Sequence, residues 1–294
     1  MIISAATIVT ATAPVELRRM TPNDIEAGLR LCRAARWDQV ARDWERFLAP
    51  PSSATVAVRE GFVIGTAAVI RYGTRFGWIG MVLVDPGAQG QGLGPSLLTH
   101  SLDALSDMSA IRLDATPAGY PLYLKQAFVE ESRLKRMESA APICPAAPAH
   151  AKIDRMTHAD LTEAAAMDLD VFGAPRKALL EWMHEGCPND ALVARRGDEL
   201  VGYLFGRRGF EFHHLGPIVA RESSIAMQLT ESCLARHGNR PVIIDAACHD
   251  DEWMRFLEES GFREQRPFIR MHRGGHPPFG RPREQFAMLG PEFG

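Results

Sequence analysis

Apolar runs of strand length alternate with amphipathic stretches of helix length along the whole chain. Continuous or period-two apolar patterns predict strands at residues 55–58, 63–70, 79–84, 111–115 and 128–137. Apolar residues at helical spacing predict helices from Thr21 to about Ala35 and over residues 36–48, and Thr21-Pro22 is a typical helix start. Because consecutive strands are joined by short turns, we expect a mixed, mostly antiparallel sheet flanked by helices, which is an α+β fold.

The second half of the chain repeats the first. Arg19-Met20-Thr21 recurs as Arg155-Met156-Thr157, Leu113-Asp114-Ala115 as Ile244-Asp245-Ala246, and Arg136-Met137 as Arg270-Met271, in the same order. Subtraction gives offsets of 136, 131 and 134 residues. Several matches in register predict two copies of one domain. We place these domains at residues 15–138 and 151–294, joined by an Ala- and Pro-rich linker at residues 139–150.

The composition argues against several classes of protein. A net charge of −3 over 294 residues gives no basic footprint for nucleic acid. No apolar run reaches the ~18 residues of a membrane span, and the first fourteen residues lack the features of a signal peptide. Five scattered cysteines indicate a reducing, cytoplasmic compartment. Adjacent His213 and His214 would point to opposite faces of a strand, so we expect no metal site. The oligomeric state stays open.

A glycine-rich turn after the strand at 79–84 is the main candidate for a ligand site. Gly90, Gly92 and Gly94 precede Pro95, and Leu98, Leu102 and Leu105 then follow at helical spacing. A strand, a glycine loop and a helix start together favour binding of a phosphate or pyrophosphate. No Gly-Lys-Ser/Thr follows, so the loop is not a Walker loop. A dinucleotide-binding loop remains an alternative, because Asp114 lies about 20 residues further on, although Pro95 stands where that motif has its third glycine.

The motif Val82-Leu83-Val84-Asp85-Pro86 followed by Gln89-Gly90-Gln91-Gly92-Leu93-Gly94 resembles the acyl-CoA loop of the GNAT superfamily of N-acetyltransferases. The resemblance extends over both halves, and the ending Met288-Leu289-Gly290-Pro291-Glu292-Phe293-Gly294 is similar to that of a bacterial two-domain subfamily. It implies that the pantetheine arm of acetyl-CoA lies along Val82, Leu83 and Val84. It also implies that the pyrophosphate is bound by Gln89, Gly90, Gln91, Gly92, Leu93, Gly94 and Pro95.

The same resemblance suggests the catalytic groups. Leu122-Tyr123 followed by Ala127-Phe128 matches the family motif that carries a tyrosine, so Tyr123 is the candidate general acid for the departing thiolate. The family's strand glutamate, which helps to deprotonate the amine, falls on Trp78. Asp43, Asp85, Glu130, water or the second half of the chain are the candidates to replace it. We expect Trp37, Gln39, Asp43 and Trp44 to face the acceptor.

The second half lacks these features. Arg221-Glu222-Ser223-Ser224 stands in place of the glycine loop, and Leu257 occupies the tyrosine position. We therefore expect the second domain to bind no cofactor and to form a wall of the acceptor cleft.

The sequence thus predicts an N-acyltransferase in which an amine attacks acetyl-CoA directly in a ternary complex. The acceptor is a small-molecule or peptide amine that the sequence does not identify, and the acyl chain length stays open. Two alternatives remain, namely a non-catalytic acyl-CoA-binding or regulatory module and a dinucleotide-dependent oxidoreductase.

Overall fold

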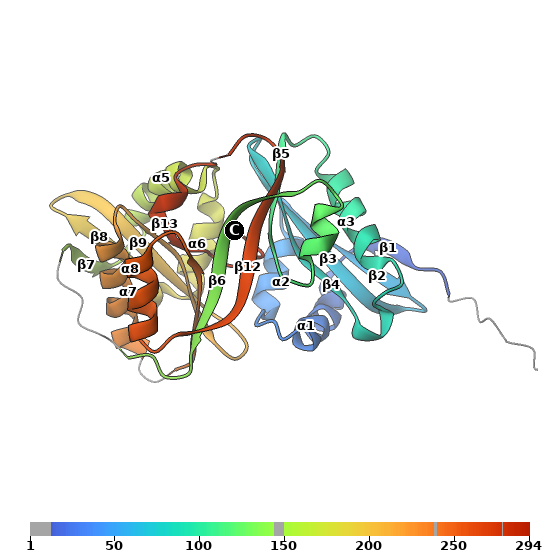
Figure 1. The fold of residues 1–294 in the computed structure, drawn as a ribbon, viewed down its shortest axis with the longest axis horizontal. Helices are drawn as coiled ribbons and strands as arrows, with labels where there is room; N and C mark the ends of the chain where they lie inside the picture. The colour runs from blue at the N-terminus through green and yellow to red at the C-terminus, as the bar shows by residue number, and fades with distance from the viewer. Residues whose placement is uncertain (1–12, 144–149, 238–239, 278) are drawn as a thin grey trace, which may run out of the picture.

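The computed structural model describes residues 13–143, 150–237, 240–277 and 279–294, in two similar series of helices and strands (Figure 1). Residues 1–12 and residues 144–149 of the expected linker lie outside the described residues. The elements of the first series are β1 (Glu16–Arg19), α1 (Ile25–Ala34), α2 (Ala41–Leu48), β2 (Ser52–Arg59), β3 (Phe62–Tyr72), β4 (Phe76–Val84), α3 (Leu93–Ala104), β5 (Ala110–Ala115), α4 (Tyr120–Leu124) and β6 (Val129–Ser139).

The second series has the same order of elements and ends with one additional strand. Its elements are β7 (Lys152–Arg155), α5 (Asp160–Phe172), α6 (Lys177–Gly186), β8 (Leu192–Arg196), β9 (Glu199–Arg208), β10 (His213–Ala220), α7 (Ser223–His237), β11 (Val242–Ala247), α8 (Asp251–Glu259), β12 (Arg263–Gly274) and β13 (Gln285–Ala287). Single 3-10 turns lie at Pro22–Asp24, Pro86–Ala88, Pro188–Asp190 and Pro282–Glu284.

The predicted fold class is confirmed, with two local differences. Each half starts with a short strand, β1 or β7, which the sequence pattern did not reveal because both are edge strands with mostly half-exposed side chains. Residues 36–40, expected to be helical, form a loop before α2, and Arg36 has a φ of 55° there. No helix among the described residues is both long and apolar enough to cross a bilayer.

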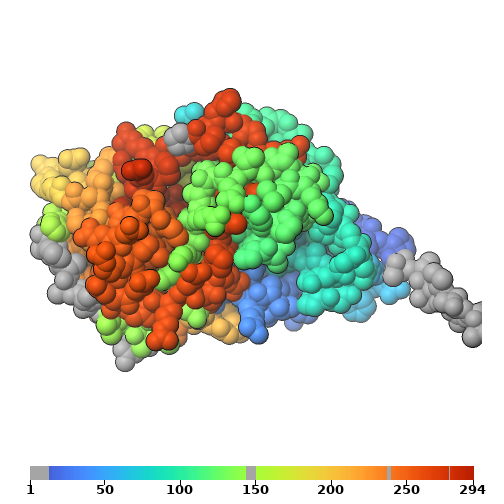
Figure 2. Space-filling model, in the orientation of Figure 1, coloured from blue at the N-terminus to red at the C-terminus, as the bar shows by residue number. Residues whose placement is uncertain are grey.

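All strands of the described residues belong to one sheet of 13 strands in the order β1-β2-β3-β4-β5-β12-β6-β11-β13-β10-β9-β8-β7. The order reveals an exchange of the corresponding strands β6 and β12 between the two series. β6 of the first half lies between β11 and β12, and β12 of the second half lies beside β5. Figure 1 shows the two strands crossing at the centre of the molecule, and in Figure 2 the residues around them interleave on the surface.

Two buried ion pairs join the exchanged strands to their new neighbours. Arg136 of β6 lies directly opposite Asp245 of β11, with Nε 2.7 Å from Oδ1. Arg270 of β12 lies opposite Asp114 of β5 in the same way, at 2.8 Å. Both pairs are bidentate, and both carboxylates are completely buried. The repeated Arg-Met and Asp-Ala motifs of the sequence are therefore the two halves of these bridges.

The C-terminal segment completes the contact between the halves. After β13 the chain turns back and ends near the centre of the molecule (Figure 1). The hydroxyl of Tyr72 and the indole N–H of Trp78 donate hydrogen bonds to the carbonyl oxygens of Phe293 and Pro291, at 2.5 and 3.0 Å. Phe293 is fully buried and stacks on Phe47 of α2. Residues of the C-terminal segment thus belong to the core around the first half.

We expect Arg270→Leu to lower the free energy of unfolding by about 3–5 kcal/mol, because the buried carboxylate of Asp114 would lose its cation. Urea denaturation followed by circular dichroism measures this loss. Lys135→Leu is the matched control, since Lys135 of β6 pairs with Glu264 of β12 with both side chains about 40% exposed. It should change stability by at most about 1 kcal/mol. Equal effects of the two substitutions would contradict the role of the buried pair.

Candidate active site

β4 separates from β5 after its first residues. Gly77 and Trp78 pair with Ile111 and Arg112, whereas residues 79–84 have strand partners only on β3. A β-bulge follows the separation, where Met81 has a φ of 54° and its carbonyl oxygen accepts a hydrogen bond from the hydroxyl of Thr66. The result is a wedge between two strands of one sheet, with unpaired backbone groups along one side of β4.

The wedge opens toward the glycine loop. Gly90 and Gly92 have φ values of 76° and 82°, in the left-handed region that glycine adopts without strain, and Gly92 is the N-cap of α3. Within the described residues, none of the backbone amides of residues 89–94 donates a hydrogen bond. A row of free amides at a helix N-terminus fits a phosphate or pyrophosphate group.

A cavity of about 950 Å³ runs from this loop along β4. Its lining includes most of the residues expected to bind the cofactor, namely Val82, Leu83, Val84, Gln89, Gly90, Gly92, Leu93, Gly94 and Pro95. Gln91 is not part of the lining, because its side chain is turned toward Arg59 and the carbonyl oxygen of Gly87.

Tyr123 also lines the cavity. Gly119 leaves room for its ring, since a Cβ atom at that position would lie 2.9 Å from the Cε2 atom of Tyr123. The ring packs edge-on against Phe128, and the hydroxyl makes no hydrogen bond to the described residues. Burial raises the pKa of Tyr123 to about 12, so the side chain stays protonated at neutral pH.

The residues expected to face the acceptor divide into two groups. Trp37 and Gln39, in the loop between α1 and α2, line the cavity. Trp44 does not, because it is fully buried between Gly28 and Phe47 in the core. Asp43 is likewise outside the lining, and its carboxylate is held by Arg207 of β9 at 2.7 Å. The helical spacing of Trp44 and Phe47 reflects their packing on the sheet.

The second half contributes part of the cavity wall. Arg266 and Phe268 of β12 and Pro291 and Glu292 of the C-terminal segment line it beside Trp37 and Gln39. Sequence reasoning missed these four residues. The ending that contains Pro291-Glu292 indicated the two-domain subfamily. Nothing in it indicated contact with β4, which lies more than 200 residues earlier.

The equivalent wedge of the second half is filled. β10 pairs with β11 only at His213 and His214, and β13 then enters between the two strands. Ala287 lies opposite both Ile218 of β10 and Ala246 of β11. The chain's own backbone therefore takes the place that is open in the first half.

The adjacent histidines of β10 lie beside different aspartates. His213 and His214 are buried beside Asp190 and Asp245, at 3.0 and 3.1 Å. In the described part of the chain, no three His, Cys, Asp or Glu side chains are placed to hold a metal ion.

Like Asp43, the other two candidate bases, Asp85 and Glu130, lie outside the cavity lining. Asp85 is paired with Arg30 at 2.5 Å, and this hydrogen bond lowers the pKa of its carboxyl. Glu130 is exposed and accepts a hydrogen bond from Tyr120 at 2.6 Å.

Comparison with known proteins identifies relatives of both halves. Residues 23–128 match the model of the Acetyltransferase (GNAT) family, and residues 164–287 match that of the Acetyltransferase (GNAT) domain. The chain is 29% identical to the holothin acyltransferase of Pseudoalteromonas sp. strain SANK 73390 over 83% of each chain. It is 27% identical to the uncharacterized N-acetyltransferase YitH of Bacillus subtilis strain 168, over 85% of this chain and 88% of the relative.

A solved structure shares the complete fold. A provisionally assigned acetyltransferase from Pyrococcus horikoshii superposes with a TM-score of 0.78 at 21% identity, covering 98% of this chain and 99% of the other. At this identity the similarity concerns the fold alone.

We expect Gly92→Ala to weaken binding of acetyl-CoA about tenfold or more. An L-residue in the left-handed region costs roughly 1–2 kcal/mol, and a loop that relaxes this strain turns its amides away from the ligand. Gly87→Ala is the matched control, because Gly87 lies in the same loop without a positive φ and a Cβ atom there would meet only Asp85 at 3.5 Å. Isothermal titration of both variants measures the difference, and similar affinities would contradict the role of Gly92.

Proposed function

The chain belongs to the GNAT family of acetyltransferases and carries two such domains in tandem, and from this premise we propose that its first domain transfers an acyl group, most simply acetyl, from coenzyme A to an amine. The observation that carries this proposal is the open wedge beside β4, which leads into the loop of free amides. GNAT domains use acyl-CoA donors, and a long pantetheine arm that extends from a pyrophosphate fits a cavity lined by β4 and the glycine loop.

The residues of the chain fit such a donor at both ends. Unpaired backbone groups of β4 can hydrogen-bond to the amides of a pantetheine arm, much as an added strand would. The free amides of residues 89–94, together with the N-terminus of α3, supply positive potential for the pyrophosphate. The thioester of the donor supplies the activated acyl group. A negative charge that develops on its oxygen can be stabilised by a backbone N–H of the splayed strand.

Tyr123 acts as the general acid in this proposal. A thiolate leaving the acyl group needs a proton, and the hydroxyl of Tyr123 has no other hydrogen-bond partner among the described residues. Its pKa of about 12 exceeds that of a thiol, which is about 8.5 in water. Burial disfavours the free thiolate as well, so the same environment raises both values. We therefore expect a helpful but not indispensable proton donor.

The acceptor would enter from the side opposite the pyrophosphate loop. A second hollow of about 640 Å³ shares Ala35, Trp37, Arg136 and Arg266 with the main cavity and gives room for the body of the acceptor. Because one relative is named an acyltransferase of holothin, donors with acyl chains longer than acetyl belong in the same assays. The chemistry proposed here is direct attack of the amine on the thioester in a ternary complex.

Calorimetric titration with acetyl-CoA should give one site per chain, because β13 fills the second wedge.

Acetyl-CoA at about 100 times its Kd should stabilise the fold by about 2.7 kcal/mol. An amine panel with thiol detection then separates catalysis from mere binding. A melting shift with NAD instead would favour an oxidoreductase. Two acetyl-CoA sites of similar affinity would contradict the expectation that the second half binds no cofactor.

Tyr123→Phe should lower kcat by about 10²-fold and leave the Kd of acetyl-CoA nearly unchanged. The reason is that the hydroxyl acts only as the thiolate departs. Stopped-flow measurement of the chemical step, with the best amine of the panel, tests this expectation. The rate of the unaltered enzyme should not fall through loss of this proton between pH 7 and about 10, since the pKa of Tyr123 is about 12. An unchanged chemical rate in the variant would leave Tyr123 with a packing role only.

A further inference from the structure

Glu292 reaches the cavity because two residues of β4 accommodate the C-terminal segment. The indole N–H of Trp78 donates a hydrogen bond to the carbonyl oxygen of Pro291 at 3.0 Å and so holds this segment on the strand. Gly80 permits the close approach, since a Cβ atom at this position would lie 2.8 Å from the carbonyl oxygen of Glu292. The side chain of Glu292 is only 2% exposed and still forms part of the cavity wall.

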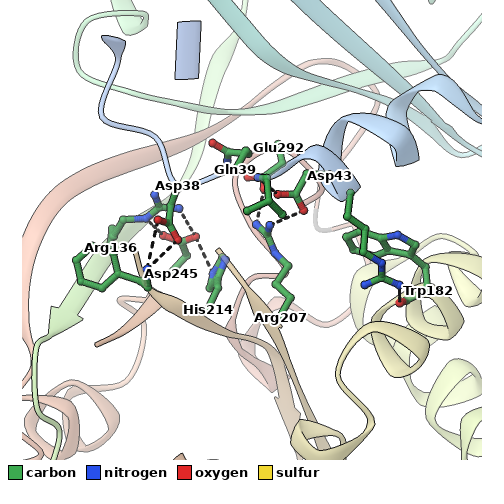
Figure 3. A network of polar contacts seen from close by, with 12 residues as sticks. Asp38, Gln39, Asp43, Arg136, Trp182, Arg207, His214, Asp245 and Glu292 are labelled. Carbon is green, nitrogen blue, oxygen red and sulfur yellow. Dashed lines mark hydrogen bonds and ion pairs between the residues drawn. The ribbon is translucent and has the colours of Figure 1, made fainter. Parts of the chain in front are cut away.

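The polar contacts of Glu292 are incomplete. Arg207 donates Nη1 to Asp43 Oδ1 at 2.7 Å and Nη2 to Glu292 Oε1, as Figure 3 shows. Asp43 Oδ2 accepts a further bond from the backbone N–H of Val40 at 2.8 Å. In contrast, Glu292 Oε2 is buried with no hydrogen-bond partner among the described residues, and so is Oε1 of the neighbouring Gln39. Two buried acceptor atoms in one cavity wall lack a donor.

The charge of this cluster is also unbalanced. One guanidinium faces two carboxylates, so the group carries a net negative charge when both acids are ionised. The pKa of Asp43 is raised to about 6, mainly by burial. The charge of Arg207 opposes this rise, and the charge of Glu292 adds to it. The adjoining ion pair of Arg136 and Asp245 is neutral as a whole. Arg266, which also lines the cavity, donates its N–H groups to Gln265 and to the carbonyl oxygen of Arg36. The cluster of Asp43, Arg207 and Glu292 therefore favours a ligand that brings positive charge and N–H donors.

We propose that Glu292 binds the ammonium form of the acceptor and takes up its proton, with Gln39 as a second hydrogen-bond acceptor. The inference rests on the proposed function, because it assigns the amine side of the same cavity. It makes the second half of the chain the source of the acceptor's base, although that half keeps no open wedge of its own.

The proposed step balances as follows. A proton moves from the acceptor ammonium to Glu292 Oε2, which leaves a neutral amine and a carboxylic acid. The amine nitrogen then forms a bond to the thioester carbon, and the bond from that carbon to sulfur breaks. Tyr123 gives its proton to the thiolate and regains one from the nitrogen of the new amide. Glu292 later releases its proton to water, so the net products are an amide, a thiol and one proton.

Two coenzyme A thioethers test the inference without turnover. S-(2-aminoethyl)-coenzyme A carries an ammonium close to where the attacking nitrogen would lie, and S-propyl-coenzyme A is its neutral counterpart of similar size. We expect the unaltered protein to bind the ammonium analogue about tenfold more tightly at pH 7.5 by calorimetric titration, since a hydrogen bond to a charged group contributes about 1.5–3 kcal/mol. Equal binding of the two analogues overturns the role of Glu292 and leaves the donor site intact.

Substitutions then locate the preference. Glu292→Gln should abolish it without changing the affinity for S-propyl-coenzyme A, and Glu292→Asp, which keeps the charge, should retain part of it. The matched control is Glu284→Gln, because Glu284 belongs to the same C-terminal region and pairs with Arg221 outside the cavity wall. A preference that survives Glu292→Gln overturns the inference. Failure of the unaltered protein to bind either analogue overturns the proposed function and this inference with it.

A pH titration of the unaltered protein tests the same inference without any substitution. The charged and titratable groups around Glu292 are Asp43 of α2, Arg207 of β9, the Arg136–Asp245 pair, His214, Arg266 and Cys32. Burial lowers the pKa of His214 and raises that of Cys32 to about 12, so both are neutral near pH 7. The preference for the ammonium should fall as the pH decreases from about 7 to 5, because Asp43, whose pKa burial raises to about 6, takes up a proton and the cluster loses negative charge. A preference unchanged down to pH 4 overturns the inference.

Discussion

Two buried arginine–aspartate bridges, Arg136 with Asp245 and Arg270 with Asp114, are the interactions on which the rest of this structure depends. Each joins an exchanged strand to the half of the chain that it did not come from. A buried ion pair of this kind adds little net stability, but breaking one leaves a desolvated charge, which is strongly unfavourable. The bridges therefore disfavour any arrangement in which Arg136 of β6 or Arg270 of β12 has no aspartate opposite it. With the strands fixed in this way, the two halves form one sheet and cannot separate without breaking it.

The continuous sheet contains the same wedge twice, with different outcomes. Between β4 and β5 the wedge stays open and forms the cavity, whereas between β10 and β11 it is closed by β13. Unpaired backbone groups in a buried place need partners. In the second half the chain itself provides these partners, and in the first half a ligand with its own amides can do so. The difference between the open and the filled wedge follows from the position of β13 and the C-terminal segment, more than from any difference in the order of helices and strands in the two halves.

That same segment then crosses to the first half, where Trp78 and Gly80 receive it. One stretch of chain thus closes one wedge and contributes Glu292 to the wall of the other. The cluster of Arg207, Asp43 and Glu292 draws its members from both halves, so its geometry depends on the exchange of strands as well. This dependence explains why a domain without an open wedge of its own can still contribute to the chemistry of the cavity.

The sequence by itself determined the local elements and the repeat. The apolar run into Gly90 and Gly92, the start of α3 and the motif around Tyr123 are short-range features, and their backbone conformation is fixed by residues a few positions apart. The repeat also revealed two domains of one type. Only the tertiary structure decided which partner each repeated motif has. Arg136 could pair with Asp114 or with Asp245, and the pattern of residues is the same in either case. The positions of Trp44 in the core and of Glu292 beside β4 were equally undetermined, because helical spacing does not reveal which face meets a cavity. A contact across more than 200 residues leaves no periodic signal, and it arises only when the whole sheet has assembled.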